Sequence, residues 1–189
     1  MPVSAASSSA LRYLPNLLTG SRLVLAPFVV YCVWSRQHMM AAVLFAAAAA
    51  TDGIDGFLAR RLHAASRAGA YLDPIADKLL LGGVYLALAS IRSVPWWLVA
   101  LIFGRDLLIL AAAITALLFT RVRAFPPSVW GKISTFFQIV TAVSFLARNA
   151  LGTAMLSALC EGLIWPTAAM TVWSGLDYGR RGSTMVRTH

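Results

Sequence analysis

The chain of 189 residues has few charged side chains, and acidic ones are scarcest. Aspartate and glutamate number seven, and charged residues make up 12% of the chain, whereas they make up about a quarter of an ordinary soluble domain. Hydrophobic residues make up 59%, and the mean hydropathy is +0.74. This composition excludes an ordinary soluble domain and predicts an integral membrane protein.

Cysteine is also rare. Cys32 and Cys160 both lie in apolar stretches, and two cysteines make neither a disulfide framework nor a zinc site, so we expect them to pack in the interior. The net charge is +9, but no soluble basic domain or aromatic RNA-binding motif accompanies it. We therefore expect anionic lipids and phosphate-bearing substrates as partners, and no nucleic acid.

The chain contains apolar runs for about six membrane-spanning helices, since each span needs about 20 apolar residues. We expect the spans near residues 20–34, 40–62, 69–91, 97–120, 128–146 and 155–173. The predicted fold class is an all-α membrane bundle with one domain over residues 11–176. Residues 1–10 would form a flexible tail, residues 11–19 a short interfacial helix broken by Pro15, and residues 177–189 a basic tail.

The distribution of arginine predicts the orientation of this bundle. Six spans put both termini on one side, and cytoplasmic loops carry the excess of basic residues. With the N-terminus inside, the inner segments contain Arg12, Arg60, Arg61, Arg67, Arg121, Arg123, Arg180, Arg181 and Arg187. The outer turns contain only Arg36, Arg92 and Arg148. Both termini, and the connection between the second and third spans, are therefore expected on the cytoplasmic side.

That connection lies within the most unusual stretch of the sequence, which contains Asp52, Asp55, Asp73 and Asp77 between long apolar runs. Carboxylates at a membrane boundary are costly and mark functional sites. Their spacings of three and four put each pair on one helix face, so two antiparallel helices could bring all four together. Pro74 either kinks the second of these helices or lies near its start. A cluster of carboxylate oxygens suits Mg²⁺ or Mn²⁺ and argues against zinc.

Other residues in the stretch suit a diphosphate. Gly56 and Gly69 leave room for a ligand at the backbone, and Arg60 adds a fixed cation. The pattern Asp52-x-x-Asp55-Gly56-x-x-Ala59-Arg60, then eight residues, then Gly69-x-x-x-Asp73-x-x-x-Asp77 resembles the signature of the CDP-alcohol phosphatidyltransferases. The resemblance implies a six-helix membrane enzyme, usually a homodimer, that displaces CMP from CDP-diacylglycerol with an alcohol.

The resemblance also implies a role for each position of the pattern. Asp52, Asp55 and Asp73 would bind two divalent ions, Mg²⁺ or Mn²⁺. Asp77, at the same metal site, would be the base that takes a proton from the acceptor hydroxyl. The CDP pocket would be formed by Gly56, Ala59, Arg60 and Gly69.

The acceptor is less well defined by the sequence. The stretch from Pro15 to Arg22 resembles the N-terminal motif of family members that make phosphatidylglycerophosphate or cardiolipin, and its polar positions are Asn16, Thr19 and Arg22. The alternative is that these residues only anchor and cap a helix at the membrane interface.

A second candidate for acceptor binding lies in the fourth span. Arg105 and Asp106 lie near mid-span, where charges must pair or face a cavity. Arg105 could pair with one of the four aspartates, or it could form an anion site with Lys132 for an acceptor phosphate. Gly104-Arg105-Asp106 is more similar to eukaryotic-type cardiolipin synthases, which slightly favours phosphatidylglycerol over glycerol 3-phosphate.

A different class of protein, a divalent-cation transporter, would also place aspartates in a membrane. Transport favours carboxylates near the midplane that are reached from both sides. Those of residues 52–77 lie at one predicted membrane face, so the enzyme is the favoured hypothesis.

Overall fold

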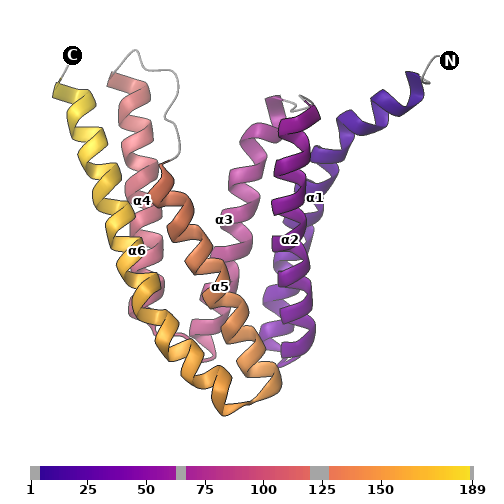
Figure 1. The fold of residues 1–189 in the computed structure, drawn as a ribbon, viewed down its shortest axis with the longest axis vertical. Coiled ribbons are helices and arrows are strands. Elements are labelled where there is room, and N and C mark those ends of the chain that lie inside the picture. The colour runs from indigo at the N-terminus through magenta and orange to yellow at the C-terminus, as the bar shows by residue number, and fades with distance from the viewer. Residues whose placement is uncertain (1–4, 63–66, 120–127, 188–189) are drawn as a thin grey trace. The chain divides into compact units, whose positions relative to one another are not determined.

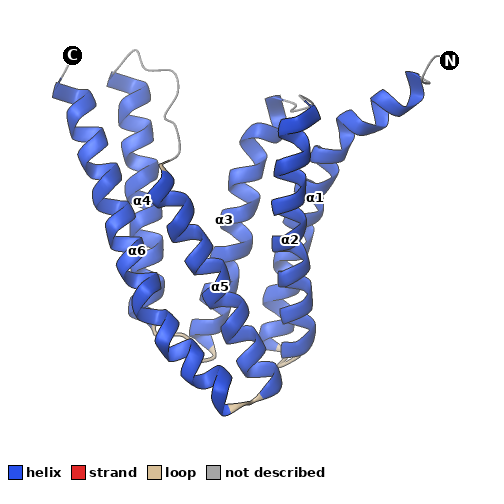
Figure 2. Cartoon of the chain, viewed as in Figure 1, coloured by secondary structure: helices blue, strands red, loops and turns tan. Residues whose placement is uncertain are grey.

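The computed structural model describes the backbone of residues 5–62, 67–119 and 128–187, and the side chains of residues 20–51, 76–112, 114 and 128–180. These ranges contain six helices and no strand. Figures 1 and 2 show the course of the helices. The helices are α1 (Ala5–Trp34), α2 (His38–Leu62), α3 (Arg67–Ser90), α4 (Trp96–Phe119), α5 (Val129–Leu151) and α6 (Ala154–Arg187). The predicted all-helical fold class is confirmed.

Two helices extend beyond the spans predicted for them. α1 begins at Ala5 and continues through Pro15, so the expected separate helix of residues 11–19 and part of the expected tail belong to one long helix. Alanine, which has the highest helix propensity, supplies Ala5, Ala6 and Ala10 and favours this extension. α6 likewise continues to Arg187, through much of the predicted basic tail. Tyr178 in that segment is buried, so packing stabilises the extension.

The other helices follow the predicted spans closely. α3 begins at Arg67, so Pro74 lies inside the helix and not at its start. α5 begins after the N-cap residue Ser128, whose side chain accepts a hydrogen bond from the Gly131 backbone. It ends at Gly152, which has the left-handed conformation (φ 65°) that favours glycine as a helix terminator. This cap lies beyond the predicted end at residue 146.

The chain divides into two compact units. The first contains α1, α2 and α3, and α1 packs against both of the others. Its core includes Val29 and Val33 of α1, Phe45 of α2, and Val84 and Tyr85 of α3, all at most 1% exposed. Because α1 contacts both helices that carry the aspartates, it is the element that positions them.

The second unit contains α4, most of α5, and α6. α4 packs along α6, and hydrogen bonds join α5 to α6. Its core combines Leu98 and Ile102 of α4 with Ala142, Phe145 and Leu146 of α5. Polar residues are buried in this unit together with apolar ones, and they form the network described below.

Two helical segments among the described residues are long and apolar enough to cross a membrane, Val129–Leu151 and Ala154–Arg180. Gly20–Trp34 and His38–Thr51 are shorter apolar helical segments. Large apolar side chains such as Phe28, Tyr31 and Trp165 are exposed, at 58%, 62% and 71%. Such surfaces are unusual for a soluble protein and suit contact with lipid.

Candidate active site

Arg22 of α1 and Asp77 of α3 form an ion pair. The Arg22 Nη1 donates a hydrogen bond to the Asp77 Oδ1 at 2.5 Å. The Arg22 side chain is only 4% exposed, whereas that of Asp77 is 42% exposed. The arginine is thus held inside the helix packing, while the carboxylate keeps an accessible side.

The packing of α1 on α3 fixes this pair. Toward the C-terminal ends of both helices, a Cβ atom on Gly83 would lie 3.1 Å from the Val30 Cγ2, so the Val30 side chain packs closely against the α3 backbone. Farther on, the Trp34 Nε1 donates a hydrogen bond to the Ser90 Oγ at 2.9 Å. The residue numbers in these three contacts increase in the same direction along both helices, so α1 and α3 run parallel. Together the contacts fix the register of the two helices.

The remaining aspartates of the predicted metal site lie on α2 and α3. Asp52 and Asp55 belong to the last turns of α2, and Asp73 precedes Asp77 by about one turn in α3. Their side chains, and those of the predicted CDP-binding residues, lie outside the described residues, as do those of Asn16 and Thr19. The convergence of the four carboxylates therefore stays a prediction. The CDP-binding residues whose side chains are not described are Gly56, Ala59, Arg60 and Gly69.

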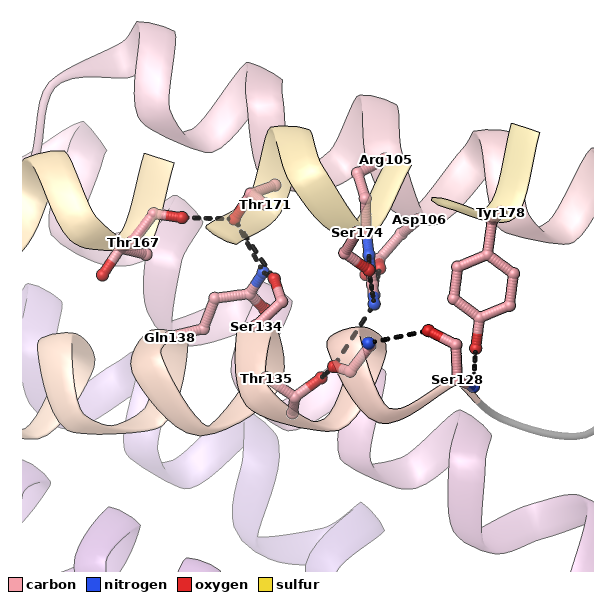
Figure 3. Close-up of polar contacts among 11 residues, drawn as sticks. Arg105, Asp106, Ser128, Ser134, Thr135, Gln138, Thr167, Thr171, Ser174 and Tyr178 are labelled. Carbon is pink, nitrogen blue, oxygen red and sulfur yellow. Dashed lines mark hydrogen bonds and ion pairs between the residues drawn. The ribbon is translucent and has the colours of Figure 1, made fainter. Parts of the chain in front are cut away.

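In the second unit, Arg105 is the centre of a buried hydrogen-bond network (Figure 3). Its Nη1 donates to the Asp106 Oδ1 at 2.7 Å, and its Nη2 donates to the Ser174 Oγ at 2.8 Å. Its Nε also donates to the Ser174 Oγ, and Nη2 reaches the Gly131 carbonyl at 3.4 Å. Arg105 therefore links α4 to both α5 and α6.

Tyr178 closes the network on the α6 side. The Ser128 backbone N–H donates to its hydroxyl at 2.8 Å, and the Arg105 Cζ lies 5.9 Å from the centre of its ring. A Cβ atom on Gly131 would lie 3.1 Å from the Arg105 Nη2 and from the Tyr178 ring. Only glycine fits at this point without displacing both side chains.

A series of buried hydroxyl and amide groups continues along the α5–α6 interface (Figure 3). The Thr141 and Thr167 hydroxyls are 2.7 Å apart, and the Gln138 Nε2 donates to the Thr171 Oγ1 at 3.3 Å. The sequence interpretation missed Thr141, Thr167 and Thr171, and also Ser174 and Tyr178. Their helical spacing could have indicated them, because residues 167, 171, 174 and 178 fall on one face of α6.

These contacts bear on the predicted acceptor residues. The described partner of Arg105 among the acids is its neighbour Asp106, and it is Arg22 that pairs with one of the four aspartates. Lys132 is exposed on α5, next to the buried Gly131. A joint anion site of Arg105 and Lys132 stays a prediction. The internal hydrogen bonds of Arg105 weigh against it, because they occupy most of the donors of this side chain.

Comparison with known proteins identifies the class. The sequence pattern of the CDP-alcohol phosphatidyltransferases matches residues 12–173. The match covers most of α1, all of α2 to α5 and the first part of α6. It includes the aspartate stretch, Arg105 and Gly131, whereas Ser174 and Tyr178 lie just beyond it. The chain belongs to the CDP-alcohol phosphatidyltransferase family, a family of membrane-associated enzymes.

Three relatives illustrate the range of the family. The chain is 33% identical to a probable phosphatidylglycerophosphate synthase of Mycobacterium tuberculosis, over 89% of this chain and 80% of the relative. It is 27% identical to the CDP-diacylglycerol–glycerol-3-phosphate 3-phosphatidyltransferase of Bacillus subtilis, over 93% and 97%. It is 32% identical to a probable CMP-forming cardiolipin synthase of Drosophila melanogaster, over 87% of this chain and 49% of that protein.

Proposed function

We propose that this enzyme transfers a phosphatidyl group from CDP-diacylglycerol to a glycerol acceptor that carries a phosphate, and releases CMP. The observation that supports this proposal most directly is the bond between Arg22 and Asp77. It joins the stretch that resembles an acceptor motif to the carboxylate expected to act as the base. A cation beside the base could attract the acceptor phosphate and so bring the acceptor hydroxyl to Asp77.

In the proposed reaction, an oxygen–phosphorus bond forms between the acceptor hydroxyl and the phosphatidyl phosphorus. The bond from that phosphorus to the bridging oxygen breaks, and CMP leaves with the electron pair. Asp77 takes the hydroxyl proton, and its partly exposed side chain leaves an edge open to an acceptor. Arg60, on the neighbouring helix of the aspartate pattern, would hold the diphosphate. A covalent phosphatidyl-enzyme is not required by this route.

The donor set of α2 and α3 fits divalent metal ions. Asp52, Asp55, Asp73 and Asp77 offer carboxylate oxygens without sulfur or imidazole, which is the ligand chemistry that Mg²⁺ and Mn²⁺ prefer. We infer that these residues hold two such ions, which would neutralise charge on the diphosphate when bound.

The acceptor favoured here is glycerol 3-phosphate. The argument from sequence for phosphatidylglycerol depended on Asp106, and this residue bonds to Arg105 within the protein. Its identity is therefore explained by packing, and it is weak support for either acceptor. Two of the three relatives described above carry names that specify phosphatidylglycerophosphate synthesis or glycerol 3-phosphate. Phosphatidylglycerol remains the second candidate because of the Drosophila relative.

We also propose six membrane spans, with both termini and the aspartate stretch at the cytoplasmic face. The excess of arginine in the predicted inner segments supports this orientation. The exposed apolar side chains along the helices support their contact with lipid. A homodimer is the expected assembly, on the strength of the family resemblance.

Purified protein supplied with CDP-diacylglycerol and either glycerol 3-phosphate or phosphatidylglycerol would test the proposal. We expect CMP release and a phosphatidylglycerophosphate product, identified by mass. Formation of cardiolipin without phosphatidylglycerophosphate would show that the acceptor is phosphatidylglycerol. Metal movement across liposomes without CMP release would instead support the transporter hypothesis and refute the enzyme.

A further inference from the structure

A groove lies between α4 and α6, within the second compact unit. Its volume is about 520 Å³, which is within the range of about 300–1,000 Å³ for small-molecule sites. Gly104 and Leu108 of α4 line one side, and Gly175, Leu176 and Gly179 of α6 line the other. None of these five residues belongs to the aspartate pattern.

Glycines keep the groove open. Glycine in membrane helices usually allows close helix packing, and Gly131 is such a case. Packing does not explain Gly104 or Gly179, because a Cβ atom at either position would meet nothing within 4 Å. At Gly175 it would meet only the Arg105 Cγ, at the ordinary contact distance of 3.7 Å. Larger residues would fit without clashes there, and their effect would be to fill the groove.

The walls of the groove are apolar and one end is cationic. Leu108, Val172 and Leu176 are exposed by 43%, 46% and 59%. Arg105 lines the floor, but Asp106 already balances its charge. Arg180 is exposed and also lines the groove. This combination fits a molecule with a long apolar part and an anionic group.

A helix of a second copy is a weaker candidate for the occupant. In a symmetric dimer the same patch of both subunits meets. A dimer centred on this groove would bring the two Arg180 side chains near each other, and like charges at an interface are unfavourable. In the proposed orientation, moreover, Arg180 lies toward the cytoplasmic surface, where basic pockets between helices bind anionic headgroups.

We propose that the α4–α6 groove binds one anionic phospholipid. Its phosphate lies at Arg180, and one acyl chain lies along Gly104, Gly175 and Gly179. Its binding uses the proposed membrane orientation but no step of the proposed reaction.

Native mass spectrometry of detergent-purified protein tests the site. Protein in a chelating buffer without CDP-diacylglycerol is equilibrated with equal amounts of phosphatidylglycerol and phosphatidylcholine that have identical acyl chains. We expect one bound phosphatidylglycerol in preference to phosphatidylcholine. Gly179→Leu, which fills the groove, should remove it. Arg180→Gln should lower the preference about fivefold, the factor expected from one basic residue near a lipid surface.

Gly162→Leu is the matched control. Gly162 is also on α6, and a Cβ atom there also meets nothing within 4 Å, but the residue does not line the groove. Both substitutions raise helix propensity equally, so only the groove distinguishes them. Retention of the lipid by Gly179→Leu would overturn the proposal. The proposal would also be overturned if Gly179→Leu left lipid binding unchanged and converted dimers to monomers, because the groove would then be the interface with a second copy. Because binding is measured without turnover, failure of the proposed reaction would not affect the result.

Discussion

The Arg22 guanidinium lies 2.5 Å from the Asp77 carboxylate, across the packed helices α1 and α3. The arginine is buried and the carboxylate is partly exposed, so the protein itself holds the cation in place and leaves one side of the acid accessible. Arg22 is thereby a positioning residue for Asp77 in the proposed reaction.

Replacing Arg22 by Gln should reduce kcat/KM about 10- to 100-fold, because it removes one charge-assisted hydrogen bond of about 1.5–3 kcal/mol. The measurement is CMP release over a range of glycerol 3-phosphate concentrations. Arg22→Lys keeps the charge and should recover part of the activity. A merely structural role would lower the unfolding temperature of both variants and leave KM for the acceptor unchanged.

Asp77→Asn should lower kcat by about 10²–10⁴, the usual contribution of a general base. The amide keeps the size of the side chain and can still contact Arg22 through its oxygen, so the helix packing should be retained. Mn²⁺ binding, followed by electron paramagnetic resonance, should persist because the other three aspartates remain. Full activity in this variant would exclude Asp77 as the base.

The sequence predicted the elements of this site better than their contacts. Long apolar runs indicate six helices, and the aspartate spacing predicts a metal site, because both are local patterns. The pairing of Arg22 with Asp77 joins residues 55 positions apart, and no local pattern specifies it. The contacts of Arg105 are a second case. Its acid is the adjacent Asp106, and its other side-chain partner, Ser174, is 69 positions away.

The helix ends that the sequence misplaced have a similar explanation. The extension of α6 depends on Tyr178, whose hydroxyl accepts a hydrogen bond from the start of α5. Polarity alone assigned this segment to a tail. Its glycines and basic residues have low hydropathy, but a tertiary contact outweighs composition at a helix end.

Chelation should abolish CMP release. If Asp52, Asp55 and Asp73 hold the ions, activity should return with Mg²⁺ or Mn²⁺, which prefer oxygen ligands, and should not return with monovalent salt. Asp55→Asn should raise the Mg²⁺ concentration needed for half-maximal rate, because it removes a charged ligand. Full activity in excess chelator would refute the metal requirement, whatever the acceptor.

Arg105→Lys distinguishes a structural role from acceptor binding. Lysine keeps the positive charge but cannot reproduce the forked bonds to Asp106, Ser174 and the Gly131 carbonyl. We expect a lower unfolding temperature and a KM for glycerol 3-phosphate within about twofold of the original, because an internal clamp does not touch the acceptor. A large rise in KM at unchanged stability would instead establish the acceptor contact that the sequence predicted.

Gly131→Ala should destabilise the protein by about 1–3 kcal/mol, the usual cost of overpacking. Its new methyl group would lie 3.1 Å from both the Arg105 Nη2 and the Tyr178 ring. Hydrogen bonds hold both side chains, so neither can retreat without losing a partner. Gly162→Ala adds the same methyl group in open space and should leave stability unchanged or raise it slightly. Equal unfolding temperatures for the two variants would contradict this prediction. They would show that the network between α4, α5 and α6 can accommodate a methyl group, and that Arg105 is held less tightly than its hydrogen bonds imply.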